Sequence, residues 1–149
     1  MREAIDNLWE LHEQGAIVCI TTNGAVSRQG RAQLLRGCAR QASERFPDLA
    51  ARLGALITAA GNHVHDLDGG LVSFPVEETP YDNPDPAIIR RSALELAALA
   101  DSRGWREVIL PRPGCGSGGL AWKEVRPLIE PLLDDRFIVI TFVDSYPQG

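Results

Sequence analysis

The sequence lacks three features that mark large classes of protein. It has no long apolar run of the kind found in membrane-spanning proteins, no paired cysteines of the kind found in disulfide-bonded proteins, and no positive net charge of the kind found in many nucleic-acid-binding proteins. No stretch approaches the roughly 18 consecutive apolar residues of a membrane-spanning helix, and no signal peptide is evident. The cysteines, Cys19, Cys38 and Cys115, are odd in number and have no paired spacing. We therefore expect reduced thiols and a cytoplasmic location.

The net charge is −5, which argues against a broad nucleic-acid-binding surface while leaving room for a local basic patch. A Walker phosphate loop is excluded, because no Gly-Lys-Ser/Thr follows the glycines. Internal repeats, low-complexity tracts and an interdomain linker are also lacking. With 149 residues, 44% of them apolar, we expect a single globular domain spanning residues 1–149.

The most informative stretch is VILPRPGCGSGGLAW, residues 108–122. Val108–Leu110 has the composition of a buried strand, and Pro111 and Pro113 are expected to end it because proline has no N–H. Residues 114–119 contain four glycines, and helical spacing of apolar residues begins at Trp122. The stretch predicts a strand, a glycine loop and a helix, an arrangement that suits phosphate binding.

Two other interpretations of this loop remain open. Glycines also occur where a loop is only tight. A dinucleotide-binding Rossmann site is the second, since Gly114, Gly116 and Gly119 nearly satisfy G-x-G-x-x-G. It is weakened because Asp134 and Asp135 precede the next strand, whereas the fingerprint expects an acidic residue about 20 positions on in a βαβ unit. No second nucleotide-binding half is expected either.

The rest of the chain alternates between helical and strand patterns. We predict helices at 2–14, 38–46, 49–60 and from 85 or 86 to Gly104, strands at 16–20, 71–76 and 137–143, the start of a strand at 62–66, loops at 27–37 and 77–86, and a polar tail at 144–149. Such alternation predicts an α/β fold with a mostly parallel sheet and helices on both faces.

Polar and charged residues cluster beside the expected carboxyl edge of this sheet. Asn23 and Gly24 follow the first buried strand, where α/β folds gather ligands, although Asn-Gly is also a common turn. Arg28 and Arg31 belong to a basic loop beside the same edge, or to a solvated surface. A metal site at His63 and His65 is disfavoured because no third ligand has suitable spacing, and we expect no metal and no cofactor.

Two phrases resemble the macrodomain family, the ADP-ribose-binding fold. RPGCGSGGLAWKEVRPLIEPLL resembles its second phosphate loop and following helix, and TTNG with LLRGCARQASERFP resembles its first loop and helix. The resemblance covers roughly residues 16–143. It is nearest to the bacterial and phage branch related to ADP-ribosyl-thymidine and ADP-ribosyl-glutamate glycohydrolases, and it implies a three-layer α/β/α fold with a mostly parallel mixed central sheet.

The resemblance also implies site residues. Asn23 matches the asparagine that meets the distal ribose and is the one catalytic candidate, through ribose orientation. The implied ligand-binding residues are Thr22, Asn23, Arg36, Gly37, Pro113, Gly114, Cys115, Gly116, Ser117, Gly118, Gly119 and Leu120. Cys115 is favoured as a small loop residue over a nucleophile, because no histidine lies nearby in sequence.

The chain departs from the family at the catalytic positions. Some hydrolases of this branch use a lysine on the strand matching 71–76, whereas the single lysine here is Lys123. Some carry an aspartate in the glycine loop, where this chain has Gly118, and the first loop, Leu35–Gly37, lacks the aspartate of another branch. We expect ADP-ribose binding and hydrolysis of ADP-ribose from Glu/Asp-linked protein or thymidine-linked DNA. The alternative is a non-catalytic ADP-ribose reader.

Overall fold

The structure is a computed structural model that describes residues 1–142, so the predicted tail at 144–149 lies outside the described residues. Within them, six strands form one sheet in the order β1-β6-β5-β2-β4-β3. All pairs are parallel except the antiparallel pair of β3 with β4. The strands are β1 (Arg2–Asp6), β2 (Ile17–Thr22), β3 (His65–Asp66), β4 (Leu71–Pro75), β5 (Val108–Pro111) and β6 (Phe137–Phe142).

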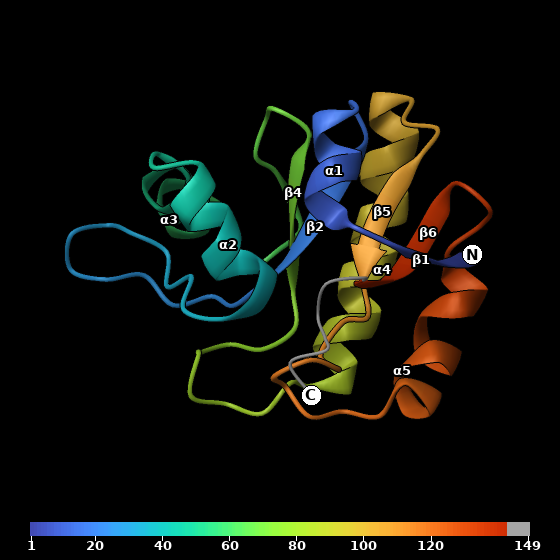
Figure 1. Cartoon of the computed structure of the whole chain (residues 1–149). Helices are drawn as coiled ribbons and strands as arrows, with labels where there is room; N and C mark the ends of the chain where they lie inside the picture. The colour runs from blue at the N-terminus through green and yellow to red at the C-terminus, as the bar shows by residue number, and fades with distance from the viewer. Residues whose placement is uncertain (143–149) are drawn as a thin grey trace.

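Helices cover both faces of the sheet (Figure 1). They are α1 (Leu8–Glu13), α2 (Gly37–Arg45), α3 (Leu49–Ala60), α4 (Pro86–Arg103) and α5 (Trp122–Ile129), followed by a short 3₁₀ turn, Glu130–Leu132. The predicted three-layer α/β/α architecture with a mostly parallel mixed sheet is confirmed.

The alternation of strand side chains builds two cores, one on each face of the sheet. Val18 and Ile20 of β2 pack in one cluster with residues of α1, α2 and α3. Cys19, between them, points to the opposite face and packs in a second cluster with residues of α4 and α5. Because β2 is buried on both faces, it appears in the sequence as a continuous apolar run.

The predicted helix at 2–14 is wrong in its first half. Arg2–Asp6 forms the edge strand β1, parallel to β6, and α1 begins only at Leu8. The side chain of Asn7 accepts hydrogen bonds from the backbone N–H groups of Trp9 and Glu10 and so caps α1. Pairing with β6 satisfies the β1 backbone even though Ile5 stays 70% exposed, so a tertiary contact overrides the local helical pattern.

The strand ends at proline as predicted: β5 closes with Pro111, which pairs with Ile140. It runs one residue beyond the predicted Val108–Leu110. The N–H of Val108 bonds to Arg136 in the connection before β6, so alternation turns the nitrogen of Pro111 toward β2. The β2–β5 ladder has already stopped at Val18 and Ile109, so the missing N–H breaks no bond. The two strands therefore separate at their carboxyl ends.

Candidate functional site

A cleft of about 660 Å³ opens where β2 and β5 separate, at the carboxyl edge of the sheet. The next parallel strand along the chain, β4, pairs with β2 on one side, whereas β5 pairs with β2 on the other, so the cleft lies at the switch point of the topology. Four parts of the chain line the cleft: residues 21–39, the connection after β4, the glycine loop after β5, and the end of β6. Figure 1 shows these connections gathered at the lower edge of the sheet.

The glycine loop, residues 114–119, presents unpaired backbone N–H groups along this cleft. Within the loop, Cys115 N–H donates to the carbonyl of Arg112 and Gly119 N–H to that of Gly116. The N–H groups of Gly114, Gly116, Ser117 and Gly118 find no acceptor among the described residues, and all four residues line the cleft. Such a set of free donors in a glycine loop is a ready site for an anion.

The loop holds its shape for reasons of backbone geometry. Gly114 and Gly119 have φ values of 74° and 83°, which a side chain would disfavour. A Cβ on Gly118 would lie 2.6 Å from both the carbonyl oxygen of Gly114 and Cγ of Pro84. By contrast, a Cβ on Gly116 would meet no heavy atom of the described residues within 4 Å. Gly116 therefore borders open space in the cleft.

The start of α2 lies on the opposite side of the cleft, where Gly37, Cys38 and Ala39 line it. Among the described residues, no side chain caps this helix, and no acidic residue occupies its first turn. The positive dipole end of this helix adds to the preference for an anion. The helix that follows the glycine loop, α5, begins only at Trp122, so the loop itself supplies the donors on the β5 side.

Asn23 lines the cleft, and its amide also shapes the first loop. Nδ2 donates to the carbonyl of Gln33 at 3.0 Å, and Oδ1 accepts from the N–H of Ala25 at 2.9 Å. Since an amide has two donors and two lone pairs, one donor and one acceptor remain for a ligand. The side chain is therefore both held in place and able to hydrogen-bond.

The structure brings ten of the twelve residues expected to bind ligand to the cleft wall, Pro113 and Gly119 being the exceptions. The carbonyl of Pro113 accepts a contact from Cys115 Sγ at 3.4 Å. Burial raises the pKa of the Cys115 thiol, while Arg112 lowers it and Glu124 raises it. A thiol that is harder to ionise is a poorer nucleophile, and the role of Cys115 as a loop residue stays a prediction.

Sequence reasoning missed Glu77, which follows β4 and lines the same cleft. It is 8% exposed, and its Oε2 atom has no hydrogen-bond partner among the described residues. The nearest cation is Arg36, with Nη2 at 3.8 Å from Oε2. Burial raises the pKa of the Glu77 carboxyl, Arg36 lowers it and Asp82 raises it. A glutamate directly after an apolar strand, SFPVE, was the available signal.

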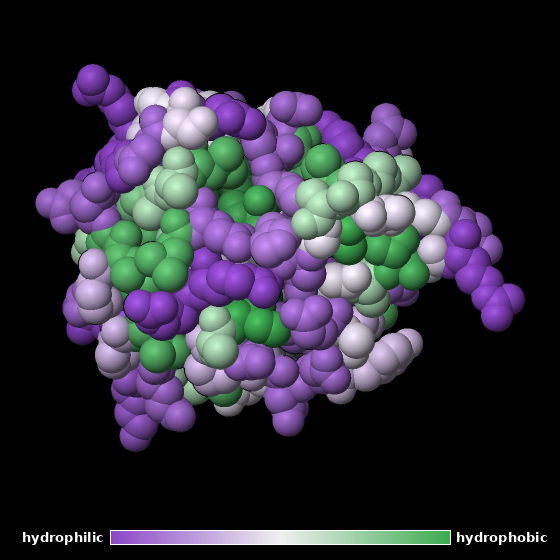
Figure 2. Space-filling view, turned by 180° about the vertical axis from the view of Figure 1, so that it is seen from behind, coloured by the Kyte–Doolittle hydropathy of each residue, from purple (hydrophilic) through white to green (hydrophobic). Residues whose placement is uncertain are grey.

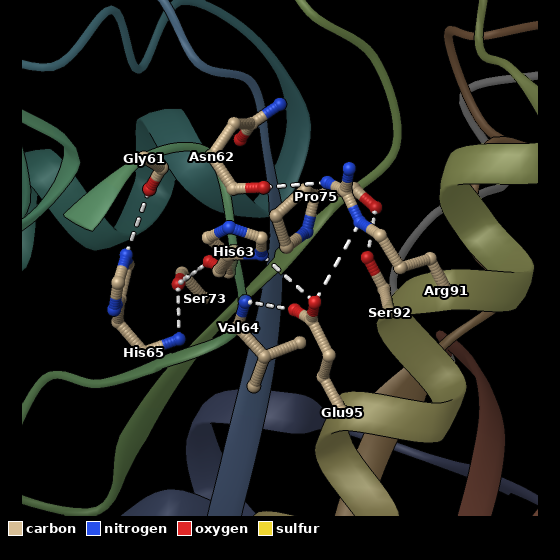
Figure 3. Close-up of polar contacts among 10 residues, drawn as sticks. All are labelled: Gly61, Asn62, His63, Val64, His65, Ser73, Pro75, Arg91, Ser92 and Glu95. Atoms are coloured by element: carbon tan, nitrogen blue, oxygen red, sulfur yellow. Dashed lines mark hydrogen bonds and ion pairs between the residues drawn. The ribbon is translucent and has the colours of Figure 1, made fainter.

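A network of polar contacts anchors the backbone around Glu77, and Figure 3 shows the part of it that joins β4 and the segment before β3 to α4. Ser92 Oγ on α4 donates to the carbonyl of Pro75 at 2.7 Å, and Asn62 Nδ2 donates to the carbonyl of Glu77 at 3.0 Å. Arg91 donates to the carbonyl of Asn62 and lies beside Glu95, which accepts from the N–H of Val64. These contacts fix the point where Glu77 leaves the sheet.

The four arginines between residues 28 and 40 have different surroundings. Arg36 Nη2 donates to the carbonyl of Pro80 at 2.6 Å, which ties the first loop to the connection after β4. Arg40 pairs with Glu44 on α2 at 3.6 Å. Arg28 and Arg31 are exposed and do not line the cleft.

Among the described residues, we find neither a metal site nor a membrane-spanning helix. Within residues 1–142, no group of three or more His, Cys, Asp or Glu side chains could hold a metal ion. No helix in that part is long and apolar enough to cross a membrane. Seen from behind, the surface mixes hydrophilic residues with separate apolar patches (Figure 2).

Solved structures with a similar fold identify the architecture. The macrodomain of DarG from Thermus aquaticus is 21% identical, with 93% of this chain and 95% of that chain covered at a TM-score of 0.73. The macrodomain of DarG from Mycobacterium tuberculosis is 19% identical, with 83% and 86% covered and a TM-score of 0.69. DarTG from Thermosipho africanus in complex with ADP-ribose is 16% identical; 87% of this chain but 38% of that chain is covered, at a TM-score of 0.68.

No protein-family model matches the sequence, and no match was found among curated proteins. At these identities the structural similarity shows the fold alone. The chain described here has the macrodomain fold, with its cleft at the switch point of the sheet.

Proposed function

We propose that this chain binds ADP-ribose in the cleft and hydrolyses the bond that joins ADP-ribose to a modified macromolecule. The observation that carries the proposal is the glycine loop, which lines a cleft at the switch point of a macrodomain fold and has four N–H groups with no acceptor among residues 1–142. The volume of about 660 Å³ lies within the usual range of small-molecule sites, about 300–1,000 Å³.

The diphosphate of ADP-ribose is proposed to lie between the glycine loop and the start of α2. Backbone N–H groups are the main donors there, because the cationic side chains of the wall, Arg36 and Arg112, are few and Arg36 already contacts Pro80 and Glu77. The distal ribose is proposed to lie beside Asn23, whose remaining donor and acceptor suit hydroxyl groups. The proposed placement matches the sheet: the glycine loop follows β5, Asn23 follows β2, and these two strands are neighbours.

Hydrolysis at the anomeric carbon passes through an oxocarbenium-like transition state. It needs a fixed ribose, a positioned water and stabilised charge. In the proposed pose, the diphosphate lies near the anomeric carbon and helps to orient the water. The linkage proposed is either the ester to Glu or Asp in a protein, or the bond to thymidine in DNA.

A non-catalytic reader is the second candidate, and one feature of the cleft wall, its lack of lysine among the described residues, favours it. Among the described residues that line the cleft there is no lysine, and Lys123 is exposed on α5. A reader would bind ADP-ribose with the same N–H groups but would not cleave it from a modified macromolecule.

One experiment separates these candidates. The protein is incubated with glutamate-linked, serine-linked and thymidine-linked ADP-ribose, free ADP-ribose is measured, and binding of free ADP-ribose is measured by calorimetry with ADP as the comparison ligand. We expect binding and release from the glutamate-linked or thymidine-linked substrate. Binding without release identifies a reader, and failure to bind refutes the proposal.

A further inference from the structure

We propose that Glu77 is the general base of this cleft, taking a proton from the water that attacks the anomeric carbon of bound ADP-ribose. The inference rests on the proposed hydrolase function and names the group in this chain that performs its proton transfer. It starts from the position of the carboxylate, its missing hydrogen bond and its fixed backbone.

Acidic side chains are seldom buried in proteins, and Glu77 is an exception. The side chain is nearly enclosed, and Oε2 is buried without a hydrogen bond among the described residues, although Arg36 supplies a positive charge at 3.8 Å. A buried polar atom left without a hydrogen bond destabilises the fold, and does so more strongly when it is charged. Stability alone therefore does not account for this residue, whereas a free acceptor in a cleft suits a water molecule.

The strand register places Glu77 beside the proposed ribose. Thr22 pairs with Pro75 across β2 and β4, and the N–H of Val76 donates to the carbonyl of Thr22 at 3.0 Å. Asn23 and Glu77 therefore leave the sheet from neighbouring strands, which lie about 4.8 Å apart. The glycine loop follows β5 on the other side of β2. A ribose held at Asn23 thus has the phosphate site on one side and Glu77 on the other.

The backbone of Glu77 is held on three sides. Its own carbonyl accepts from Asn62 Nδ2, the preceding carbonyl of Pro75 accepts from Ser92 Oγ, and the carbonyl of Glu78 accepts from the N–H of Gly24 at 2.9 Å. Figure 3 shows Ser92 on α4 bonded to Pro75, and Asn62 in the segment before β3. The two donors therefore belong to different elements. A general base needs such a fixed position, since proton transfer requires hydrogen-bond distance to the water.

The proton and electron balance of the step is simple. The water oxygen forms a bond to the anomeric carbon while the bond from that carbon to the leaving oxygen or nitrogen breaks, and its electron pair stays on the leaving group. Glu77 accepts one proton of the water and later gives it to the leaving group or to solvent. Burial raises the pKa of Glu77, which makes the carboxylate a stronger base, while Arg36 opposes its protonation.

The test compares Glu77→Gln and Glu77→Asp with Glu78→Gln, the exposed neighbour that lies outside the cleft wall. Single-turnover release of ADP-ribose should fall by about 100-fold or more in Glu77→Gln. Binding of free ADP-ribose, measured by calorimetry, should stay within about threefold of wild type. Glu77→Asp should keep part of the rate because it retains the carboxylate, and Glu78→Gln should match wild type.

The pH profile distinguishes a base from a structural residue. In the wild type, release should decline in acid as Glu77 becomes protonated, with Arg36 and Asp82 as the charged groups that set the midpoint. That acid limb should be lost in Glu77→Gln. Because Gln removes a poorly satisfied charge, the variant should melt no lower than wild type near neutral pH.

The outcomes separate this inference from the proposed function. If wild type releases ADP-ribose and Glu77→Gln releases it at a similar rate, or keeps the acid limb, Glu77 is not the base and the hydrolase proposal stands. If wild type binds ADP-ribose but releases none from any substrate, both the hydrolysis and the role of Glu77 are overturned, and the binding result stands by itself.

Discussion

A charge placed at Gly116 offers the sharpest test of the phosphate site. This glycine lacks the left-handed φ of its neighbours Gly114 and Gly119, and an added Cβ would meet no heavy atom of the described residues within 4 Å. A side chain there should leave the loop intact and enter the cleft. Gly118 is a poorer choice, because its Cβ would lie 2.6 Å from the carbonyl oxygen of Gly114 and force the loop to move.

The magnitude follows from Coulomb's law. A carboxylate about 5 Å from two phosphate charges is repelled by roughly 1.7 kcal/mol in bulk water and by roughly 7 kcal/mol at an effective dielectric constant of about 20. For a cleft open to solvent we expect the lower part of this range, about 2–4 kcal/mol, which weakens the affinity about 30-fold to 1,000-fold.

The assay is calorimetry of ADP-ribose with Gly116→Glu and with Gly116→Gln, which has nearly the same shape and no charge. The Glu variant should bind more weakly by the factor above, and the gap between the two should shrink at about 0.5 M salt because mobile ions screen the repulsion. Thermal melting should show both variants folded. Equal and undiminished affinity in the two variants would place the diphosphate away from the glycine loop.

Three other predictions concern the first loop and the lysine. Asn23→Ala should lower turnover more than binding, because ribose orientation matters most in the transition state. A rate within about twofold of wild type, a change of only about 0.4 kcal/mol, would contradict this. Since the amide of Asn23 also bonds to Gln33 and Ala25, the melting temperature of the variant should drop as well. Borohydride trapping with substrate should give no covalent adduct, and a mass increment on Lys123 would show that α5 reaches the site. Replacing both Arg28 and Arg31 with alanine should weaken the binding of an ADP-ribosylated oligonucleotide and leave the binding of free ADP-ribose unaffected, because both arginines lie outside the cleft wall. Equal losses of affinity for the two ligands would place the arginines inside the nucleotide site. No loss of affinity for either ligand would leave them as solvated surface.

Local sequence determined much of this protein. The bounds predicted for the helix at 49–60 match α3, and the strand, glycine loop and helix of residues 108–129 were read from composition and spacing. These features depend on side-chain periodicity and on the absence of Cβ atoms, which neighbouring residues reveal. The glycine loop could therefore be located before its surroundings were known.

Tertiary structure decided the rest. Residues 2–6 became a strand because β6 offers a parallel edge more than 130 residues away along the chain, which no local pattern encodes. Pro111 can form the last residue of β5 because the β2–β5 ladder has already stopped at Ile109. The position of Glu77 after an apolar strand was visible in the sequence, but its burial and its place near Asn23 depend on the pairing of β4 with β2. Composition and spacing can indicate an anion-binding loop, but the distance between groups from different strands is set by how the sheet is ordered and where its strands separate.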